Sequence, residues 1–304
     1  MKQIIIASGK GGTGKTSISA AFASLTQKAV FADCDVDASD LHLILSPKII
    51  EKENFVCGKE AIIKPLECSS CGLCYQLCRF EAIVPNTESK SYAVSSIACD
   101  GCGVCVQHCP EKAIDFIDKE SGMCFHSHTR FGPLIHAQLY PGGENSGKLV
   151  SLVRKKAIEL AQASNMDFIL IDGPPGIGCP VIASLTSCDA LLAIVEPSLS
   201  SLHDAKRLLQ LSKHFAIPSY VVINKWDISP KLTKIMEAEF QNMGIEVLGK
   251  LPYDLVFTKA MIKAQTIIEY DSTGEISQTL RSIWKKLIHK NEYQPYLIKK
   301  EGIL

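Results

Sequence analysis

Eight of the thirteen cysteines lie between Cys68 and Cys109 and repeat one spacing twice. The first run comprises Cys68, Cys71, Cys74 and Cys78, and the second comprises Cys99, Cys102, Cys105 and Cys109. The second run begins 31 residues after the first (99 minus 68). Thirteen cysteines would suggest disulfide bonds in a small secreted chain. Because these eight are clustered at short spacings, they instead indicate thiolate ligands of a metal group.

The spacing C-x2-C-x2-C-x3-C resembles the cysteine run of bacterial two-cluster ferredoxins, in which the fourth cysteine of each run binds the other run's [4Fe–4S] cluster. The resemblance implies one cluster on Cys68, Cys71, Cys74 and Cys109, and a second on Cys99, Cys102, Cys105 and Cys78. Zinc, the alternative, is held by isolated C-x2-C pairs with longer spacers. Pro110 follows Cys109 as in ferredoxins, whereas Arg79 follows Cys78, a departure that leaves the ligand set intact and puts the local turn in doubt.

A glycine-rich loop near the N-terminus has the G-x-x-x-x-G-K-[ST] pattern of a phosphate-binding loop. It follows a strand expected over 3–8 and opens a helix expected over 17–27, so backbone N–H groups can surround an anion. Lys15 would reach the β- and γ-phosphates, and the Thr16 hydroxyl would bind Mg²⁺. The expected nucleotide-binding residues of the loop are Gly9, Lys10, Gly11, Gly12, Thr13, Gly14, Lys15, Thr16 and Ser17.

Lys10 is a second lysine in this loop, directly after its first glycine. With this lysine, the loop resembles the deviant Walker A loop of the superfamily that contains MinD, ParA, Mrp and the nitrogenase iron protein. The resemblance implies a nucleotide-dependent homodimer in which Lys10 reaches the phosphates bound by the partner subunit. The alternative is a solvated loop lysine without that role.

Acidic side chains follow two of the expected strands. Asp172 comes after the apolar strand 168–171, at the Walker B position, where a carboxylate can hold Mg²⁺. Three aspartates follow the strand 29–32, where the superfamily has a switch loop, and these are Asp33, Asp35 and Asp37. We expect Asp35 to orient the attacking water and Asp37 to assist Mg²⁺, although a helix cap or a solvated acid is the alternative for each. The expected catalytic residues are Lys10, Lys15, Asp35 and Asp172.

Residues that recognise the base are expected at the carboxyl end of the strand that precedes Asn224. The run 224–227 matches the N-K-x-D sequence that reads guanine in many GTPases, while the superfamily uses the same asparagine for adenine. Together with Pro252, Tyr253 and Asp254, Asn224 favours ATP. GTP is the alternative, because an aspartate can face the guanine base.

The elements around these residues alternate between strands and helices. Strands are expected over 3–8, 29–32, 168–171, 190–195, 220–223 and 246–249, and helices over 17–27, 149–163, 202–215, 231–243 and 277–289. This alternation predicts an α/β fold with a mainly parallel sheet. The resemblance of the glycine-rich loop implies that the fold is a P-loop NTPase of the SIMIBI type. We expect the ATPase domain over 1–58 and 119–290, an inserted α+β two-cluster ferredoxin domain over 59–118, and a tail over 291–304.

Composition excludes several classes of protein. Lys plus Arg (32) equals Asp plus Glu (32), so the chain lacks the general basic field of a non-specific nucleic-acid binder. The longest apolar runs, such as 190–195, are too short to span a membrane, and the N-terminus leaves no room for a signal peptide. We therefore expect a cytoplasmic protein without a transmembrane segment or a nucleic-acid partner.

Three further features are weaker candidates. Cys179, just past Asp172, is similar in position to a cysteine with which the nitrogenase iron protein binds a cluster across its dimer, and core packing is the alternative. Cys124, His126 and His128 would share one face of a strand, where packing is favoured over metal binding. The basic amphipathic stretch 280–288 is similar to the membrane-binding helix of MinD, but a last domain helix explains it equally well.

Over nearly all of residues 1–289 the chain resembles MinD-superfamily ATPases that carry an inserted two-cluster ferredoxin domain. The resemblance implies slow, Mg²⁺-dependent ATP hydrolysis coupled to electron transfer through two clusters to an acceptor protein. One alternative is a scaffold or maturation factor for iron–sulfur or other metal cofactors, although no C-x-x-C follows Asp172 as in Mrp-type carriers. The other is a positioning ATPase whose clusters only stabilise the fold.

Overall fold

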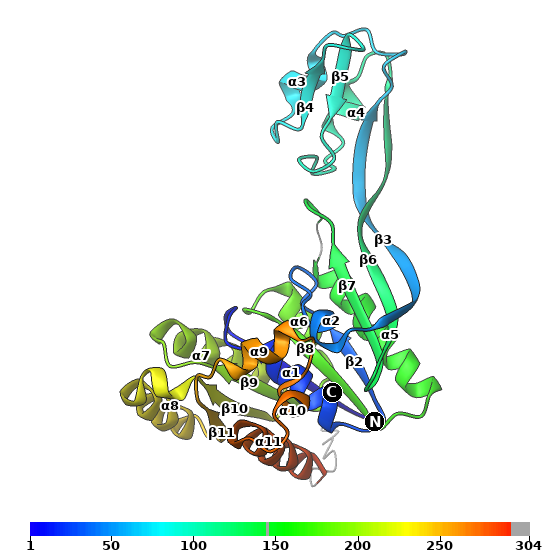
Figure 1. The fold of residues 1–304 in the computed structure, drawn as a ribbon. Helices are drawn as coiled ribbons and strands as arrows, with labels where there is room; N and C mark the ends of the chain where they lie inside the picture. Colours follow the sequence, from blue (N-terminus) through cyan, green and yellow to red (C-terminus); the bar gives the residue numbers. More distant parts are fainter. Residues whose placement is uncertain (144–145, 293–304) are drawn as a thin grey trace, which may run out of the picture.

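A computed structural model describes residues 1–143 and 146–292 and contains a broad body from which a long hairpin rises to a small globular end (Figure 1). We refer to the hairpin of β3 (Lys48–Ile63) and β6 (Ile114–Thr129) as the arm. Residues 64–113 at its far end are the tip, and the other described residues are the body. Of the tail expected over 291–304, residues 293–304 lie outside the described residues.

The body is built on a sheet with the strand order β11-β10-β9-β1-β8-β2-β7-β6-β3. Neighbours from β11 to β7 pair in parallel, whereas β6 and β3 are added antiparallel. The parallel strands are β1 (Lys2–Ser8), β2 (Ala29–Asp33), β7 (Gly132–Leu139), β8 (Phe168–Pro175), β9 (Ala190–Val195), β10 (Ser219–Asn224) and β11 (Glu246–Leu251). The predicted α/β fold with a mostly parallel sheet is confirmed.

Helices cover both faces of this sheet, because strands buried on both faces need an apolar layer on each side. One face is covered by α5 (Ser146–Ala163), α6 (Cys179–Leu185), α7 (Leu199–His214) and α8 (Pro230–Asn242). The other is covered by α1 (Lys15–Leu25), α2 (Leu41–Leu45), α10 (Ile267–Tyr270) and α11 (Glu275–Glu292). A 3-10 turn, Trp226–Ile228, follows β10, and α9 (Val256–Ile262) follows β11. The carboxyl ends of the parallel strands therefore stay open to a ligand.

The amphipathic stretch 280–288 belongs to α11, and its apolar face is packed against the body. Leu280, Ile283, Trp284 and Leu287 are buried there, and the rings of Trp284 and Phe22 stack with their centroids 5.1 Å apart. Among the described residues, no helix is long and apolar enough to cross a membrane.

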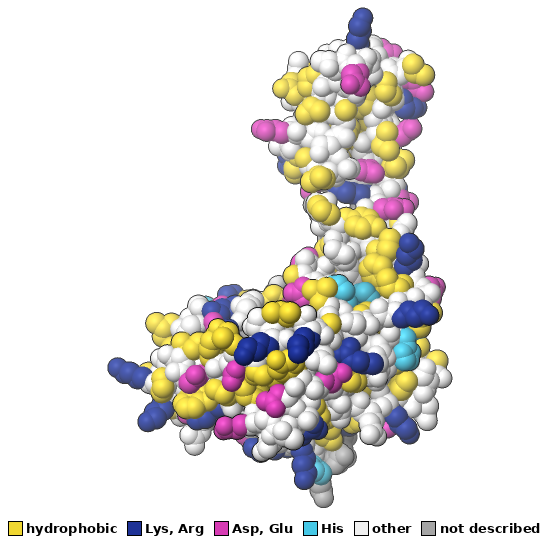
Figure 2. Space-filling model, viewed as in Figure 1, with side chains coloured by type: hydrophobic (Ala, Val, Ile, Leu, Met, Phe, Trp, Pro, Cys, Tyr) yellow, Lys and Arg dark blue, Asp and Glu magenta, His cyan; other side chains and the backbone are white. Residues whose placement is uncertain are grey.

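The arm and the tip are inserted between β2 and β7. β3 and β6 pair along their length, and Figure 2 shows the arm as a narrow neck between the body and the tip. The tip contains α3 (Leu73–Leu77), α4 (Val104–His108) and a small sheet of β4 (Ile83–Asn86) and β5 (Ser91–Val94). The positions expected as domain junctions lie at one level of the arm, because Lys59 pairs with Asp118 and forms an ion pair of 2.7 Å with it.

Candidate functional site

The glycine-rich loop joins β1 to α1 at the carboxyl end of the sheet, and its glycines are needed for the conformation that it adopts. Gly12 and Gly14 have φ of +79° and +89°, a left-handed region in which other residues are strained. A Cβ on Gly14 would lie 2.4 Å from Asn224 Nδ2, and one on Gly9 would lie 2.6 Å from the backbone of Asp204. The loop therefore depends on glycine both for its backbone angles and for close packing.

Lys15 lies between two buried carboxylates. Its Nζ is 3.3 Å from Asp35 Oδ2 and 3.2 Å from Asp172 Oδ1. Burial lowers the pKa of Lys15, but the charges of Asp172 and Asp35 outweigh burial and hold it above its ordinary value. The ammonium group is therefore charged, and the structure brings together three of the four residues predicted to be catalytic.

Asp172 also has an atom suited to a metal ion. Its Oδ1 accepts a hydrogen bond of 2.7 Å from Ser19, whereas its Oδ2 is buried without a hydrogen-bond partner among the described residues. A carboxylate oxygen of this kind is a ligand that Mg²⁺ prefers. The Thr16 hydroxyl, the other predicted ligand from the loop, lies 3.4 Å from Lys15 Nζ. These residues fit a Mg²⁺ ion that accompanies a bound phosphate.

The three aspartates after β2 have different surroundings. Asp33 accepts hydrogen bonds from Asp35 N at 3.1 Å, Ser39 Oγ at 2.8 Å and Leu41 N at 3.2 Å, so it holds the loop that leads into α2. Burial, together with repulsion from the charge of Asp172, raises the pKa of Asp33 to about 7. Asp35 faces Lys15, and burial raises its pKa, whereas Asp37 is exposed. Asp33 thus has a structural position, and Asp35 is the aspartate of this loop at the lysine.

Lys10 is held by an ion pair within its own subunit. Its Nζ lies 2.7 Å from one carboxylate oxygen of Glu196, and Lys225 Nζ lies 3.0 Å from the other. Lys225 also donates to the Gly12 carbonyl at 2.8 Å, which ties this pair to the loop. Partial burial raises the pKa of Glu196, but hydrogen bonds from Lys10 and Lys225 outweigh it and hold the pKa below its ordinary value. Glu196 was not among the residues predicted from the sequence.

A cavity that is open to solvent adjoins the loop. The predicted base-recognition residues come together in its wall, which comprises Gly14, Ser17, Asn224, Lys225, Pro252, Tyr253, Asp254, Phe257, Thr258 and Met261. Asn224 Nδ2 donates to the Thr13 carbonyl at 2.8 Å, which fixes the end of β10 to the loop. Asp227 accepts a hydrogen bond of 2.6 Å from Tyr253 N and does not line the cavity. The α9 side of the wall was not predicted, because it carries no recognised motif.

The eight cysteines of the tip form two separate groups, and all thirteen cysteines are free thiols. One cavity is lined by Cys68, Cys71, Cys74 and Cys109, and another by Cys78, Cys99, Cys102 and Cys105. Each group unites three cysteines of one run with the fourth cysteine of the other. Buried apolar side chains lie beside the thiols, namely Ala61, Ile63, Ile83 and Ile114. Four thiols around one hollow fit the donor set of a four-iron cluster.

The backbone repeats in the two halves of the tip. α3 and α4 each begin after a glycine with positive φ, 77° at Gly72 and 73° at Gly103, and each helix follows the second cysteine of its run by two residues. Among the described residues, no three His, Cys, Asp or Glu side chains are arranged to hold a single metal ion. The weaker candidates on β6 therefore form no such site. Cys124 is buried, His126 is half-buried and His128 is exposed. Cys179 is exposed at the start of α6.

A glycine-rich loop between the first strand and helix of a parallel sheet defines a P-loop nucleotide-binding protein. More particularly, the chain belongs to the CobQ/CobB/MinD/ParA nucleotide-binding domain family, which matches residues 4–267. An uncharacterized protein of Methanocaldococcus jannaschii is 33% identical over 288 residues, which cover 94% of this chain and 96% of that protein.

Two further comparisons differ in how much they cover. An iron–sulfur cluster carrier protein of Pyrococcus furiosus is 28% identical over 160 residues, 47% of this chain and 52% of that protein. The solved structure of the septum site-determining protein MinD with Mg-ADP, from Pyrococcus horikoshii, superposes with a TM-score of 0.57 at 18% identity, covering 94% of this chain and 95% of that one. At this identity the likeness concerns the fold alone.

Proposed function

We propose that this protein binds and hydrolyses ATP with Mg²⁺ as a nucleotide-dependent homodimer, and that its nucleotide state controls electron transfer from the tip to an acceptor protein. The observation that carries the proposal is the joining of two sites by one arm. The loop with Lys15 lies in the body, and two cavities, each lined by four cysteines, lie in the tip.

In the body, each residue near the loop has a separate role. Lys15 would bind the β- and γ-phosphates, Thr16 and Asp172 would hold Mg²⁺, and Asp35 would orient the attacking water, with Asp37 available from the surface of the loop. Asn224 and the stretch 252–254 would contact adenine, a choice supported by the position of Asp227, which pairs with Tyr253 N instead of lining the cavity. The Mg-ADP of the similarly folded MinD structure supports the same ligand class.

Lys10 would act on the nucleotide of the partner subunit. In the single chain its ammonium group is paired with Glu196, so dimerisation would require that pair to open. When this ion pair opens, Lys10 exchanges its contact with the Glu196 carboxylate for a contact with a phosphate group, which carries more negative charge. This exchange is favourable for a partly buried lysine. Glu196 would therefore oppose dimerisation until a nucleotide is present.

In the tip, Cys68, Cys71, Cys74 and Cys109 would hold one cluster, and Cys78, Cys99, Cys102 and Cys105 the other. The clusters, when bound, would supply one-electron transfer. Cys71 and Cys102 are exposed, one in each group, so both groups reach the surface at which an acceptor protein could dock. The division of the chain into an ATPase domain and an inserted domain over 59–118 belongs to this proposal.

A second candidate function is the assembly of metal cofactors. It is supported by the relatives named iron–sulfur cluster carrier proteins, which match about half of this chain. In that case the tip would deliver a cluster instead of electrons.

Anaerobic purification followed by iron and sulfide analysis and EPR tests the first requirement, for which we expect eight irons per chain. The sample is then mixed with an acceptor, with and without ATP. Reduction of the acceptor only with ATP, while iron stays on the protein, supports electron transfer. Movement of iron to an apo-acceptor supports assembly instead, and stimulation by membranes or DNA without redox dependence supports a positioning ATPase.

Three variants test the ATPase part. Lys15→Gln should abolish hydrolysis, and Lys10→Ala should abolish both hydrolysis and ATP-dependent dimerisation, measured by light scattering. Glu196→Gln should shift dimerisation to lower ATP concentrations, because Lys10 is no longer held in its own subunit. Lys206→Gln, which breaks a 2.7 Å ion pair between α7 and α8, is the control. Wild-type hydrolysis by a monomeric Lys10→Ala variant would exclude the trans role.

A further inference from the structure

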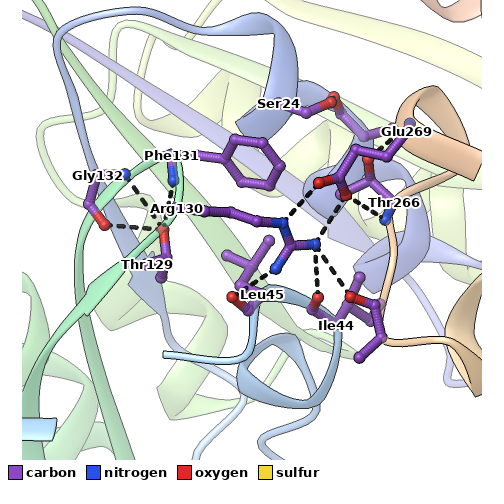
Figure 3. Close-up of polar contacts among 11 residues, drawn as sticks. Ser24, Ile44, Leu45, Thr129, Arg130, Phe131, Gly132, Thr266 and Glu269 are labelled. Atoms are coloured by element: carbon purple, nitrogen blue, oxygen red, sulfur yellow. Dashed lines mark hydrogen bonds and ion pairs between the residues drawn. The ribbon is translucent and has the colours of Figure 1, made fainter. Parts of the chain in front are cut away.

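Arg130 lies in the turn between β6 and β7, which is the root of the arm, and its guanidinium group contacts two other segments of the body (Figure 3). The turn is fixed by Thr129, whose Oγ1 accepts from Phe131 N at 3.1 Å and Gly132 N at 3.2 Å. The ring of Phe131 lies against the guanidinium group, 4.7 Å from centroid to Cζ. Arg130 is thus rigidly attached to the arm while its donors point into the body.

The first contacted segment is the end of α2. Arg130 Nη1 donates to the Leu45 carbonyl at 2.8 Å, and Nη2 donates to the Ile44 carbonyl at 3.1 Å. A cation at these positions satisfies carbonyls that the helix leaves unpaired at its C-terminus. The start of the same helix is bonded to Asp33 through Leu41 N at 3.2 Å. α2 therefore connects the aspartate loop of the nucleotide site to Arg130.

The second segment joins α9 to α10. Arg130 Nη2 donates to the Ala264 carbonyl at 3.0 Å, and Nε and Nη2 form a two-fold contact of 2.6 and 2.7 Å with the carboxylate of Glu269. Glu269 also accepts from Thr266 N at 2.8 Å and so belongs to the N-terminal cap of α10. Ala264 has a φ of +50°, a strained backbone that these contacts hold in place.

This second segment supports one wall of the base cavity. α9, which ends just before Ala264, lines the cavity with Phe257, Thr258 and Met261. Met261 also accepts a hydrogen bond of 3.5 Å from Ser17 in the first turn of α1, directly after the phosphate loop. A ligand that fixes α9 against the phosphate loop therefore also fixes the segment after α9, whose Ala264 carbonyl accepts a hydrogen bond from Arg130.

We propose that Arg130 is the positioning residue through which the nucleotide site and the root of the arm stabilise each other. The planar guanidinium group can donate to the carbonyls of α2, to the Ala264 carbonyl and to the Glu269 carboxylate at the same time only in one arrangement of these segments. A nucleotide that orders α2 and α9 will therefore order the β6–β7 turn. Because linkage is reciprocal, loosening this turn must weaken nucleotide binding by the same factor. The inference rests on the proposed function only in requiring that the cavity takes a nucleotide.

Hydrogen–deuterium exchange on the full chain, with and without Mg-ADP, tests the inference. In the wild type we expect Mg-ADP to slow exchange over 256–270 and also over 125–136. In Arg130→Gln, exchange over 256–270 should still respond to Mg-ADP, the response over 125–136 should be lost, and the Kd for Mg-ADP should rise about tenfold. Lys206→Gln, which breaks an ion pair of comparable exposure elsewhere in the body, should leave both responses unchanged.

Glu269→Gln keeps the shape of the partner side chain and provides the test if Arg130→Gln fails to fold. It should reduce the response over 125–136, and the double variant should raise the Kd no more than the stronger single variant, because both changes break the same pair. A wild type that binds Mg-ADP without slower exchange over 125–136 overturns the role of Arg130 and leaves the nucleotide site intact. A wild type that binds no nucleotide overturns the proposed function itself.

Discussion

The body and the tip are stabilised by different means. In the body, large apolar clusters cover both faces of the sheet, with fully buried side chains such as Phe22, Phe31 and Phe240. The apolar cluster beside the cysteines has one buried member in the tip, Ile83, and three at the adjoining end of the arm, Ala61, Ile63 and Ile114, and the remaining contacts come largely from cysteines. A unit of about 50 residues with so small a core needs a staple such as a metal group. The body can fold by hydrophobic burial, whereas the tip would depend on the clusters proposed for its cysteines.

The two halves of the tip also differ in their contact with the rest of the chain. Lys119 Nζ donates to the Cys99 carbonyl at 3.1 Å and to the Gly142 carbonyl at 3.3 Å. Gly142 packs so closely on Ile97 that a Cβ on the glycine would lie 2.6 Å from the Ile97 carbonyl. The second cysteine group is therefore tied to the loop after β7, and disturbance of the body should reach it before the first group.

The largest expected effect is loss of the folded tip when the proposed clusters can no longer bind. Cys71→Ser combined with Cys102→Ser should make 64–113 sensitive to trypsin while Mg-ADP binding by the body persists, because metal binding supplies the folding free energy of such a unit. Limited proteolysis with mass spectrometry measures this. Cys179→Ser, at an exposed cysteine of the body, is the control. A double variant whose tip resists trypsin would show that the apolar core is sufficient.

The next effect concerns the core of the body. Phe22 is fully buried and stacked on Trp284, so Phe22→Ala should lower the free energy of unfolding of the body by about 3–5 kcal/mol. Urea unfolding followed by tryptophan fluorescence measures it. Phe215→Ala removes an aromatic ring that is 38% exposed, and it should have a much smaller effect. Equal losses from both variants would contradict the description of the core.

A third effect depends on pH and acts at the root of the arm. Burial, with the neighbouring His42, lowers the pKa of His136 from 6.5 to about 4. Between these values the unfolded chain binds a proton that the folded chain does not, so stability is complete above pH 6.5 and falls as the pH decreases toward 4, by at most about 3 kcal/mol. The Tm of the wild type and of His136→Phe over this range measures the effect. A wild-type slope that persists in the variant would assign the acid sensitivity to other groups.

The smallest expected effect is in the part of the arm that adjoins the tip. The ion pair of Lys59 and Asp118 is largely exposed, with side-chain exposures of 47% and 67%, so Lys59→Gln should change stability by less than about 1 kcal/mol. The backbone ladder of β3 and β6 would then account for the cohesion of the arm. Hydrogen–deuterium exchange rates over 55–62 and 115–120 measure this effect. Much faster exchange in the Lys59→Gln variant would mean that the ion pair stabilises the arm more than the backbone hydrogen bonds between β3 and β6 do.

The sequence predicted two candidate sites, because each depends on local spacing. Gly14-Lys15-Thr16 must follow a strand and open a helix, and cysteines at fixed intervals must return to one hollow. β3 was not predicted, since most of its residues are exposed and charged ones interrupt any alternation. An edge ribbon of this kind is held by the backbone of its partner, and its side chains carry little pattern.

The contact between Arg130 and Glu269 could not be predicted either, because the two residues are 139 positions apart. Thr266 and Glu269 do have the spacing of a capping box, which predicts the start of a short helix. Nothing in that local pattern indicates that the same carboxylate receives an arginine from the root of the arm. Such a pairing arises from the order of the strands in the sheet, which a local motif does not encode.

The length of the arm determines how the two sites can influence each other. A strand of 16 residues spans about 50 Å at roughly 3.3 Å per residue, several times the distance of about 8 Å over which salt screens a charge. The field of a phosphate therefore fades long before it reaches a cysteine. A tilt of the arm is not screened in this way. The part of the arm beyond the pairing of β6 with β7 is about eight residues or roughly 26 Å long, so a tilt of about 5° moves its far end by roughly 2 Å. That displacement is enough to open or close the seam between Ile97 and Gly142.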